Sequence, residues 1–533
     1  MTEPTLRWTG IQPLGERALL IDCDAPQHLA RALARIAPVG LEIVSGLTTV
    51  LVSAERPLDE ASVRELLGAT SSLGGEEGRG EHRVAVVLDG ADLDEALDRT
   101  GLSIDEVARS LTEMSFEVAT VGFAPGFGYL TGLGGPLASL ERRVTPRPRV
   151  PAGSVAVAAG YAAIYPQATP GGWWLLGRSD VELFDPLSGA PSLLRAGDLV
   201  GFEVVDGLAP RREQRRRERL APPSGAAGVL KVARATPGCS VVDDGRRGWS
   251  SVGVPRGGAF DADRASLVRG LLGDAPGALE VASGGVIFDV LGDVVIAGLD
   301  LLLEVDGLPV PSGVPVSLRA GSQLTVTEVS RGDRGYLGLA NGPLIEPILG
   351  SMGTDQLCFV GPGLLEVGDV LGVDRSTPRL RRSISATGWG SPGRVRVLGG
   401  PQRAQLARAG SLDGLAGVVR APSNRVGLRV EPLGGPLELA GAELASFPVV
   451  TGAIQVPPDG SMIILGPDHA TLGGYPVVGC VIGADLGKLG RLAVDDEITF
   501  EEVDLTEARN AFYEHEAMLA SWRGPRRAGL ANP

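Results

Sequence analysis

The sequence predicts a β-rich α+β protein in two halves, with a small α+β domain at its N-terminus. Glycine contributes 77 and proline 39 of the 533 residues, and this glycine content is about twice the usual share. Short apolar runs alternate with Gly- and Pro-containing turns, which favours many short strands over long helices. Composition also changes between residues 206 and 228, where the basic run Arg211–Arg219 precedes a segment rich in Ala, Pro, Ser and Gly. Such a segment is typical of a linker, and it divides the chain into two halves.

Residues 1–80 are expected to form the small α+β domain, and residues 81–206 a second domain of strands. Apolar residues at helical spacing predict two helices in the first domain, and shorter apolar runs predict its strands. The expected helices are 26–36 and 58–67, and the expected strands are 17–22, 41–44 and 48–53. In the second domain, Ser103 and Glu106 have the spacing of a capping box at a helix start. Its strands are expected at 82–88, near 118–121, up to 157 and at 199–204.

After the linker over 207–228, the second half is expected to form two β domains, over 229–375 and 376–533. A helix is predicted from Asp261 to Leu272, and a terminal helix from Leu505 to about Trp522. Strands are expected at 228–233, between 286 and 329, and at 395–398, 462–465, 477–482 and 495–500.

Composition excludes several classes of function. The net charge of -15 and the pI near 4.9 disfavour nucleic acid, whose phosphates require a basic face. The only lysines are Lys231 and Lys488, and no phosphate-binding G-x-x-x-x-G-K-[ST] motif occurs. No apolar stretch reaches about 18 residues, so no membrane span is expected, and the N-terminus does not resemble a signal peptide. A cytoplasmic location is therefore expected.

The four cysteines predict neither disulfides nor zinc. Cys23, Cys239, Cys358 and Cys480 are far apart and form no C-x-x-C pair, so buried thiols in a reducing compartment are expected. No metal site is predicted.

One polar turn in the second half is a candidate site. It follows the apolar strand 462–465 and contains Asp468 and His469, before a second apolar strand at 477–482. A histidine titrates near neutral pH, so His469 or Asp468 is a candidate for proton transfer. A role in stabilising the turn is the alternative for His469.

A second candidate lies in the first half, between residues 122 and 130. Pro125 and Gly126 allow the backbone to approach a ligand, while Phe127 and Tyr129 offer rings to it. The alternative is a tight turn that packs its own aromatic rings.

Five arginines are the remaining candidates for ligand binding, because a guanidinium forms bidentate hydrogen bonds with a carboxylate or phosphate. They are Arg147, Arg149, Arg178, Arg256 and Arg425, and a structural ion pair is the alternative for each. Pro255, Arg256 and Gly257 precede the helix expected at Asp261, and a glycine-rich turn before a helix is a natural anion site. Taken alone, these patterns indicate a soluble, β-rich, two-part protein that binds a small anionic ligand.

Several motifs, in order, resemble known families. Gly122–Leu130, Thr145–Ser154 and Pro170–Arg178 resemble the B subunit of 5-oxoprolinase, a family also called allophanate hydrolase subunit 1 or Kip-type kinase inhibitor. Gly253–Asp261, Gly452–Gly460 and Gly473–Pro476 resemble the C subunit, also called allophanate hydrolase subunit 2 or Kip antagonist. The resemblance covers nearly the whole chain. Departures such as Leu472 in place of a common threonine bear more on the exact substrate than on the fold.

The resemblance implies a fold and an activity. It implies cyclophilin-like β-barrels in both halves, and ATP-dependent opening of 5-oxo-L-proline to L-glutamate together with the separate A subunit of 5-oxoprolinase, which is a LamB/YcsF-type protein. ATP, with Mg as its accompanying ion, is the expected cofactor. Gln455, Gly473, Gly474 and Tyr475 belong to the matching motifs, and they are expected to form one wall of a shared site opposite Gly122–Leu130.

Two other functions stay open. The paired halves also resemble the carboxyltransferase part of urea carboxylase, which works with biotin. No biotin is expected on this chain, because Leu519 occupies the acceptor position of the loosely similar stretch Glu516–Ala520. The Kip names imply a regulatory module that binds a histidine kinase. Homo-oligomerisation is left open.

Overall fold

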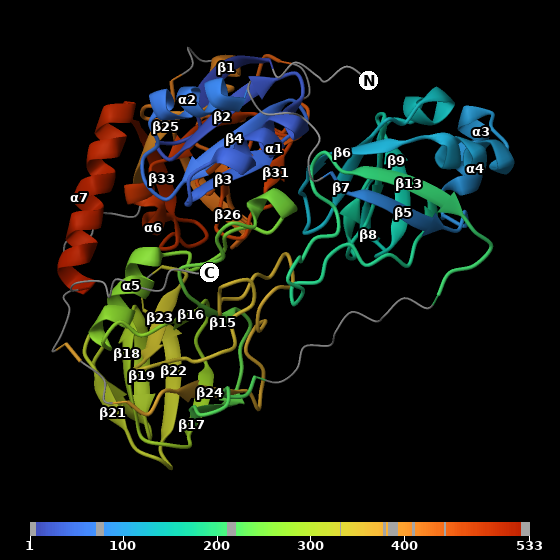
Figure 1. Cartoon of the computed structure of the whole chain (residues 1–533). Coiled ribbons are helices and arrows are strands. Elements are labelled where there is room, and N and C mark those ends of the chain that lie inside the picture. Colours follow the sequence, from blue (N-terminus) through green and yellow to red (C-terminus); the bar gives the residue numbers. More distant parts are fainter. Residues whose placement is uncertain are drawn as a thin grey trace.

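The computed structural model describes residues 7–70, 79–209, 220–330, 332–376, 380–381, 393–407, 411–441 and 444–523. The described residues form a four-stranded N-terminal sheet, a seven-stranded sheet, a pair of packed sheets and a closed barrel, in that order along the chain. Figure 1 shows that the blue N-terminal domain lies on the orange and red C-terminal barrel, while the teal first-half barrel lies beside them. Residues 210–219 of the expected linker lie outside the described residues.

The N-terminal domain is a sheet covered by two helices, as the sequence predicts. Its strands are β1 (Trp8–Pro13), β2 (Ala18–Cys23), β3 (Leu41–Ser45) and β4 (Thr49–Ala54), in the order β1-β2-β4-β3, and its helices are α1 (Pro26–Ile36) and α2 (Glu60–Thr70). Apolar residues at helical spacing, among them Leu29, Leu33 and Val63, pack against Ile21 and Val50 of the sheet. A hydrogen bond joins this domain to the C-terminal part of the chain: the Gly483 amide donates to Glu16 Oε1 at 2.9 Å.

The first barrel follows directly. Its strands are β5 (Glu81–Val86), β6 (Phe116–Val121), β7 (Gly128–Thr131), β9 (Ser154–Ala158), β10 (Tyr161–Ile164), β12 (Trp174–Arg178) and β13 (Leu199–Val204). The sheet order is β12-β9-β10-β7-β6-β13-β5. Backbone bonds of 3.0 and 2.9 Å between Val87 and Arg178 join its two ends. The helices α3 (Leu93–Thr100), α4 (Ile104–Glu113) and η1 (Gly135–Ser139) flank it, and the predicted capping box of Ser103 and Glu106 starts α4.

The second barrel has the same strand order. Its strands are β25 (Arg394–Gly399), β26 (Ala416–Asn424), β27 (Gly427–Pro432), β29 (Ala453–Gln455), β30 (Met462–Leu465), β32 (Val477–Val481) and β33 (Glu497–Glu502). They close in the order β25-β32-β29-β30-β27-β26-β33. Four helices accompany them: η3 (Arg403–Gln405), η4 (Gly483–Asp485), α6 (Leu486–Leu489) and the terminal α7 (Leu505–Arg523).

The two barrels are topological equivalents. In each, the first strand pairs in parallel with the last, β5 with β13 and β25 with β33. Each also carries a two-stranded arm, β8 (Arg147–Val150) with β11 (Thr169–Gly171), and β28 (Phe447–Pro448) with β31 (Leu472–Gly473). The prediction of β-barrels in both halves is confirmed.

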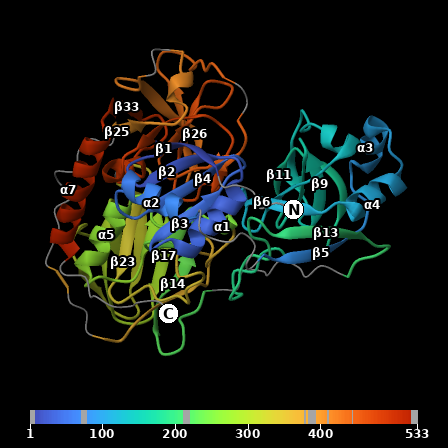
Figure 2. The same cartoon turned by 45° about the horizontal axis from the view of Figure 1, so that its top comes forward.

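Between the barrels in sequence lies a module of two packed sheets. One sheet has the order β20-β19-β22-β17-β14-β24 and the other β15-β16-β23-β18-β21, with α5 (Ala262–Leu271) and η2 (Ser250–Val252) beside them. Their bounds are β14 (Ala227–Arg234), β15 (Cys239–Val242), β16 (Ala278–Val281), β17 (Val286–Val290), β18 (Val294–Leu299), β19 (Leu301–Val305), β20 (Leu308–Val310), β21 (Val316–Leu318), β22 (Gln323–Val329), β23 (Gly335–Leu339) and β24 (Val370–Val373). Figure 2 shows this module, in green and yellow, below the N-terminal domain.

One apolar cluster joins three of these parts. It contains Leu20 of the N-terminal sheet, Phe127 and Tyr165 of the first barrel, and Phe447 and Leu472 of the second barrel. Burial of apolar surface stabilises such a junction in proportion to the area removed from water. The two barrels are therefore held together by a common core.

Two further features concern the state of the cysteines and the apolar character of the helices. All four cysteines are buried and free. None of the described helices is both long and apolar enough to cross a membrane.

Candidate functional site

A cavity of about 1200 Å³ lies between the two barrels. Its volume exceeds the roughly 300–1,000 Å³ of common ligand pockets. Both two-stranded arms contribute to it, with Gly171 at the end of β11 and Leu472 and Gly473 of β31 in its lining. The cavity therefore belongs to neither half alone.

The first-half wall is aromatic. Phe127, Tyr129, Tyr165 and Trp173 line the cavity, and the Phe127 ring lies edge-on to the other three at centroid distances of 5.1, 5.2 and 5.9 Å. Edge-to-face packing of this kind fixes ring orientation. The turn that presents Phe127 is closed by a 3.0 Å bond from the Gly122 amide to the Phe127 carbonyl. Burial raises the pKa of Tyr129, so this hydroxyl stays protonated at neutral pH.

The second-half wall combines polar and apolar side chains with glycine backbone. Gln455, at the end of β29, is 5% exposed and lines the cavity together with Gly473, Gly474 and Tyr475. The Val456 amide donates to the Pro476 carbonyl at 3.0 Å, which ties this loop to the start of β32. These residues line the same cavity as Phe123, Phe127 and Tyr129 of Gly122–Leu130, and their part in binding a ligand stays a prediction.

Equivalent Gly-Gly-aromatic turns lie in the two arms. Gly171 precedes Gly172 and Trp173, and Gly473 precedes Gly474 and Tyr475. A Cβ at Gly171 would lie 2.4 Å from the Tyr165 hydroxyl, and one at Gly473 would lie 2.3 Å from Gln455 Nε2. The first glycine of each pair is therefore required for a cavity side chain to keep its position.

Two arginines that the sequence analysis did not single out line the cavity, Arg142 and Arg143. Arg143 is held in place, because its Nη1 lies 2.9 Å from Asp92 Oδ1 and its guanidinium lies 4.6 Å from the Trp174 ring centre. Arg142 is exposed, and no ion pair holds it among the described residues. The only signal in the sequence was their position just before the matching motif Thr145–Ser154.

None of the five predicted anion-binding arginines is in the cavity lining, and three of them belong to the first barrel. Arg147 pairs with Asp92, which also holds Arg143. Arg178 pairs with Asp89 at 2.6 Å on the surface. Arg149 is exposed on β8. The structure thus favours the structural ion pair for Arg147 and Arg178.

The turn residues Pro125 and Gly126 make contacts between modules. The Gly126 amide donates to the Val252 carbonyl at 3.0 Å, and a Cβ at Gly253 would lie 2.5 Å from the Ala124 carbonyl oxygen. They hold the aromatic turn against η2 and do not line the cavity.

The stretch Pro255–Gly257 also joins modules. Arg256 lies 3.1 Å from Glu55 of the N-terminal domain, and the Gly257 amide donates to the Pro467 carbonyl at 3.1 Å. Through these contacts the stretch joins the N-terminal domain to the second barrel.

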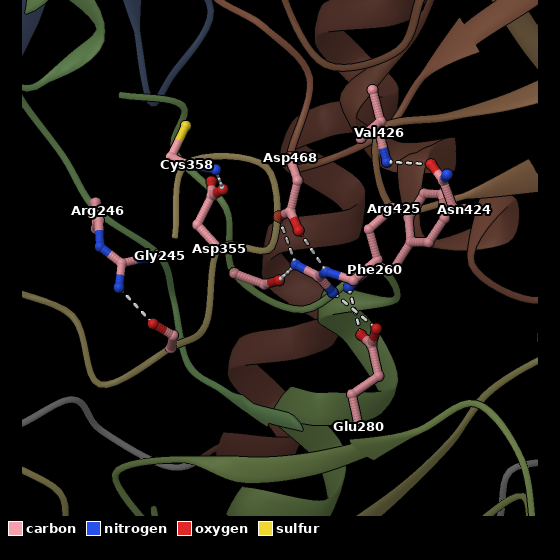
Figure 3. A network of polar contacts seen from close by, with 12 residues as sticks. Gly245, Arg246, Phe260, Glu280, Asp355, Cys358, Asn424, Arg425, Val426 and Asp468 are labelled. Carbon is pink, nitrogen blue, oxygen red and sulfur yellow. Dashed lines mark hydrogen bonds and ion pairs between the residues drawn. The ribbon is translucent and has the colours of Figure 1, made fainter. Parts of the chain in front are cut away.

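Arg425 and Asp468 form a buried ion-pair network (Figure 3). Two guanidinium nitrogens of Arg425 contact the two Asp468 oxygens at 2.8 and 2.7 Å, and a third contacts Glu280 Oε1 at 2.7 Å. Asp468 is 0% and Arg425 6% exposed. Burial alone would raise the pKa of Glu280, but the Arg425 and Arg334 guanidinium groups outweigh it and hold that pKa below its ordinary value. These charges satisfy one another and do not line the cavity.

His469 is enclosed as well. It is 6% exposed, and its Nδ1 lies 2.7 Å from the Ala470 carbonyl oxygen. Burial lowers the pKa of His469, which keeps the ring neutral at pH 7. Neither His469 nor Asp468 belongs to the cavity lining, and a role for them in proton transfer stays a prediction.

Asp355 gives this network a pH dependence. Burial, followed by the nearby Asp468 charge, raises the pKa of Asp355 to about 7, whereas an unfolded aspartate titrates near about 3.9. The folded state then binds a proton more tightly, so stability is greatest below the unfolded pKa and falls as pH rises toward 7. We expect Asp355→Asn to flatten the fall in melting temperature between pH 4.5 and 7. Parallel melting curves for variant and parent across that range would contradict this assignment.

Among the described residues, no group of three or more His, Cys, Asp and Glu side chains is arranged to hold a metal ion. The cavity itself carries two carboxylates, Glu438 and Asp459.

Comparison with known proteins identifies the family. The carboxyltransferase domain, subdomain C and D, matches residues 9–194, and the carboxyltransferase domain, subdomain A and B, matches residues 252–502. The chain is 33% identical over 300 residues to the 5-oxoprolinase C subunit of Escherichia coli (strain K12), covering 53% of this chain and 94% of that protein. It is 34% identical over 204 residues to the 5-oxoprolinase B subunit of Escherichia coli O157:H7, covering 36% of this chain and 93% of that protein.

The chain belongs to the family of the B and C subunits of 5-oxoprolinase. It unites in one polypeptide sequences that resemble both subunits. The crystal structure of TTHA0988 is similar over 91% of this chain and 99% of its own, with 33% identity and a TM-score of 0.81. The two matched regions lie in the two halves of the chain, and residues of both line the cavity.

Proposed function

We propose that this chain is the fused B and C component of an ATP-dependent 5-oxoprolinase, and that the cavity between the barrels binds 5-oxo-L-proline. The cavity is the observation that carries the proposal. It forms where the B-like and C-like halves meet, and the motifs shared with the family contribute both of its walls. The reaction opens the lactam to L-glutamate with consumption of ATP and water.

The walls suit such a substrate. The aromatic rings of Phe127, Tyr129 and Trp173 offer apolar faces to the ring methylenes of 5-oxoproline. Arg142 is the cavity cation without an ion pair in the described part of the chain, and we assign it to the substrate carboxylate.

ATP supplies the driving force, because phosphorylation of the lactam oxygen turns a poor electrophile into a good one. The cavity volume of about 1200 Å³ leaves room for a nucleotide beside the small lactam. Tyr475 is 43% exposed and offers a stacking face to adenine. Mg²⁺ on protein sites takes one or two carboxylates together with phosphate oxygens, and Glu438 and Asp459 are the carboxylates of the cavity lining that would hold it.

Removal of Arg142 tests the carboxylate assignment. We expect Arg142→Ala to raise KM for 5-oxoproline by roughly tenfold, the worth of one charge-assisted bond, with a smaller change in kcat. Steady-state ATP hydrolysis with varied 5-oxoproline measures both constants. The control is Arg149→Ala, since Arg149 is exposed and outside the cavity lining. An unchanged KM in Arg142→Ala, or an equal rise in Arg149→Ala, would refute the assignment.

The function as a whole is tested by reconstitution. The chain is mixed with a purified A subunit of 5-oxoprolinase, and ADP release is measured with and without 5-oxo-L-proline. We expect 5-oxoproline-dependent ADP release and glutamate formation in the mixture, and neither from the chain alone. A mixture that forms no glutamate would refute the proposal.

A carboxyltransferase is the second candidate, because both halves match carboxyltransferase subdomains. It predicts carboxyl exchange with carboxybiotin supplied in solution. Binding to a histidine kinase without turnover of either kind would instead favour a regulatory module.

A further inference from the structure

Gln455 is a buried polar side chain in the cavity whose bonding is incomplete. It is 5% exposed and lines the cavity. Its Nε2 lies 3.5 Å from the Tyr475 carbonyl oxygen, at the outer limit of a hydrogen bond, and this is the one side-chain hydrogen bond of Gln455 among the described residues; its Oε1 is not one of their fully buried unpaired atoms and is open to the cavity. Buried amide groups in folded proteins almost always pair both their donor and their acceptor. A carboxamide that lies at a cavity wall with a single long hydrogen bond can therefore take a ligand group as its further partner.

The surroundings hold this carboxamide in one place. Gly473 lies so close that a Cβ there would come within 2.3 Å of Nε2, and Ile454 and Val456 on either side are buried in the barrel core. The backbone of Gln455 is paired in the sheet with Val477 and Ile463. Because strand, neighbours and glycine fix it, the amide is preorganised and loses little freedom on binding.

The chemistry of a primary carboxamide selects its partner. It presents an N–H donor and a C=O acceptor side by side. A five-membered lactam ring holds its own amide cis, so its N–H and C=O also lie on one edge, and the two groups pair through two N–H···O=C bonds. A trans peptide directs these groups to opposite sides and cannot pair in this way. The ring-opened product L-glutamate has no such edge.

We propose that Gln455 recognises the cis-amide edge of the substrate, and that this pairing makes the site selective for lactams over open-chain amino acids. The inference rests on the proposed 5-oxoprolinase function and names the specificity residue of its cavity. Loss of both bonds when the ring opens also weakens product binding, which favours release of glutamate.

The test compares two ligands on three proteins. The ligands are 5-oxo-L-proline and N-methyl-5-oxo-L-proline, which lacks the N–H; the proteins are the parent chain, Gln455→Ala and Gln455→Glu. Each protein is mixed with the 5-oxoprolinase A subunit, and kcat/KM is taken from ATP hydrolysis. We expect the parent to prefer 5-oxoproline at least tenfold, about the worth of one lost hydrogen bond. We expect Gln455→Ala to lower kcat/KM for 5-oxoproline by ten- to a hundredfold and to bring the two ligands within threefold of each other.

The ratio of the two ligands separates recognition from damage to the fold, because a partly unfolded variant loses activity on both equally. Gln455→Glu keeps the shape and the acceptor but loses the donor, and it should retain part of the preference. An unchanged preference in Gln455→Ala would overturn the inference while the proposed function stands. Failure of the parent chain to turn over 5-oxoproline would remove the proposed function and this inference with it.

Discussion

Replacing Gly473 by alanine is expected to lower kcat/KM for 5-oxoproline by about 100-fold. The new Cβ would lie 2.3 Å from Gln455 Nε2, so the carboxamide must move, and a displacement of about 1 Å at a site costs this much in rate. The backbone needs no unusual angle at Gly473, because its φ is not in the left-handed region. The effect should therefore fall on the cavity rather than on folding, and the melting temperature should change little.

Gly474 supplies a matched control one residue away. A Cβ at Gly474 would meet nothing within 4 Å, so Gly474→Ala should keep kcat/KM within about twofold of the parent. The pair is compared by steady-state ATP hydrolysis in the presence of the A subunit, and by thermal melting. Equal activity of the two variants would contradict the placement of Gln455 against Gly473.

Replacing Arg425 by methionine is expected to destabilise the protein by about 3–5 kcal/mol. Arg425 makes both of the side-chain contacts to Asp468, which is fully buried. Removing one partner of a buried pair leaves an uncompensated charge, and the cost lies in this range. Chemical denaturation followed by tryptophan fluorescence measures the loss.

Two further variants make this result specific. Arg420 lies on β26, before Arg425, and pairs on the surface with Glu431 and Asp495 at 2.7 and 2.6 Å. Exposed pairs contribute about 0–1 kcal/mol, so Arg420→Met should have little effect. The double variant Arg425→Met, Asp468→Leu removes both charges and should recover part of the loss. A loss in Arg425→Met no larger than that in Arg420→Met would show that the network does not support the fold.

Local patterns made most of the fold predictable. Apolar periodicity places α1 and α2, and the capping box of Ser103 and Glu106 places α4. Gly- and Pro-containing turns predict where one strand ends and the next begins. Closure of the first barrel depends on long-range pairing of Val87 with Arg178, which no local pattern reveals. The β-barrels were expected only from the family resemblance.

The sequence predicted which two motifs contribute to the candidate site, but it did not predict which arginines line it. The motifs at 122–130 and 473–476 both contribute to one cavity, the first through Phe123, Phe127 and Tyr129 and the second through its glycines and Tyr475. A sequence cannot show whether an arginine faces a ligand or a carboxylate far along the chain. Arg425 finds Glu280, which is 145 residues away, while Arg142 has a similar sequence context to Arg147 and yet lines the cavity.

A crystal structure of the chain with 5-oxo-L-proline tests the central claim most directly. The account predicts ligand density in the cavity between the barrels, with the lactam edge at Gln455 and the ring against Phe127, Tyr129 and Trp173. Density at any other place, such as the buried Arg425–Asp468 network, would contradict it. So would an empty cavity in crystals grown at a 5-oxoproline concentration that saturates turnover.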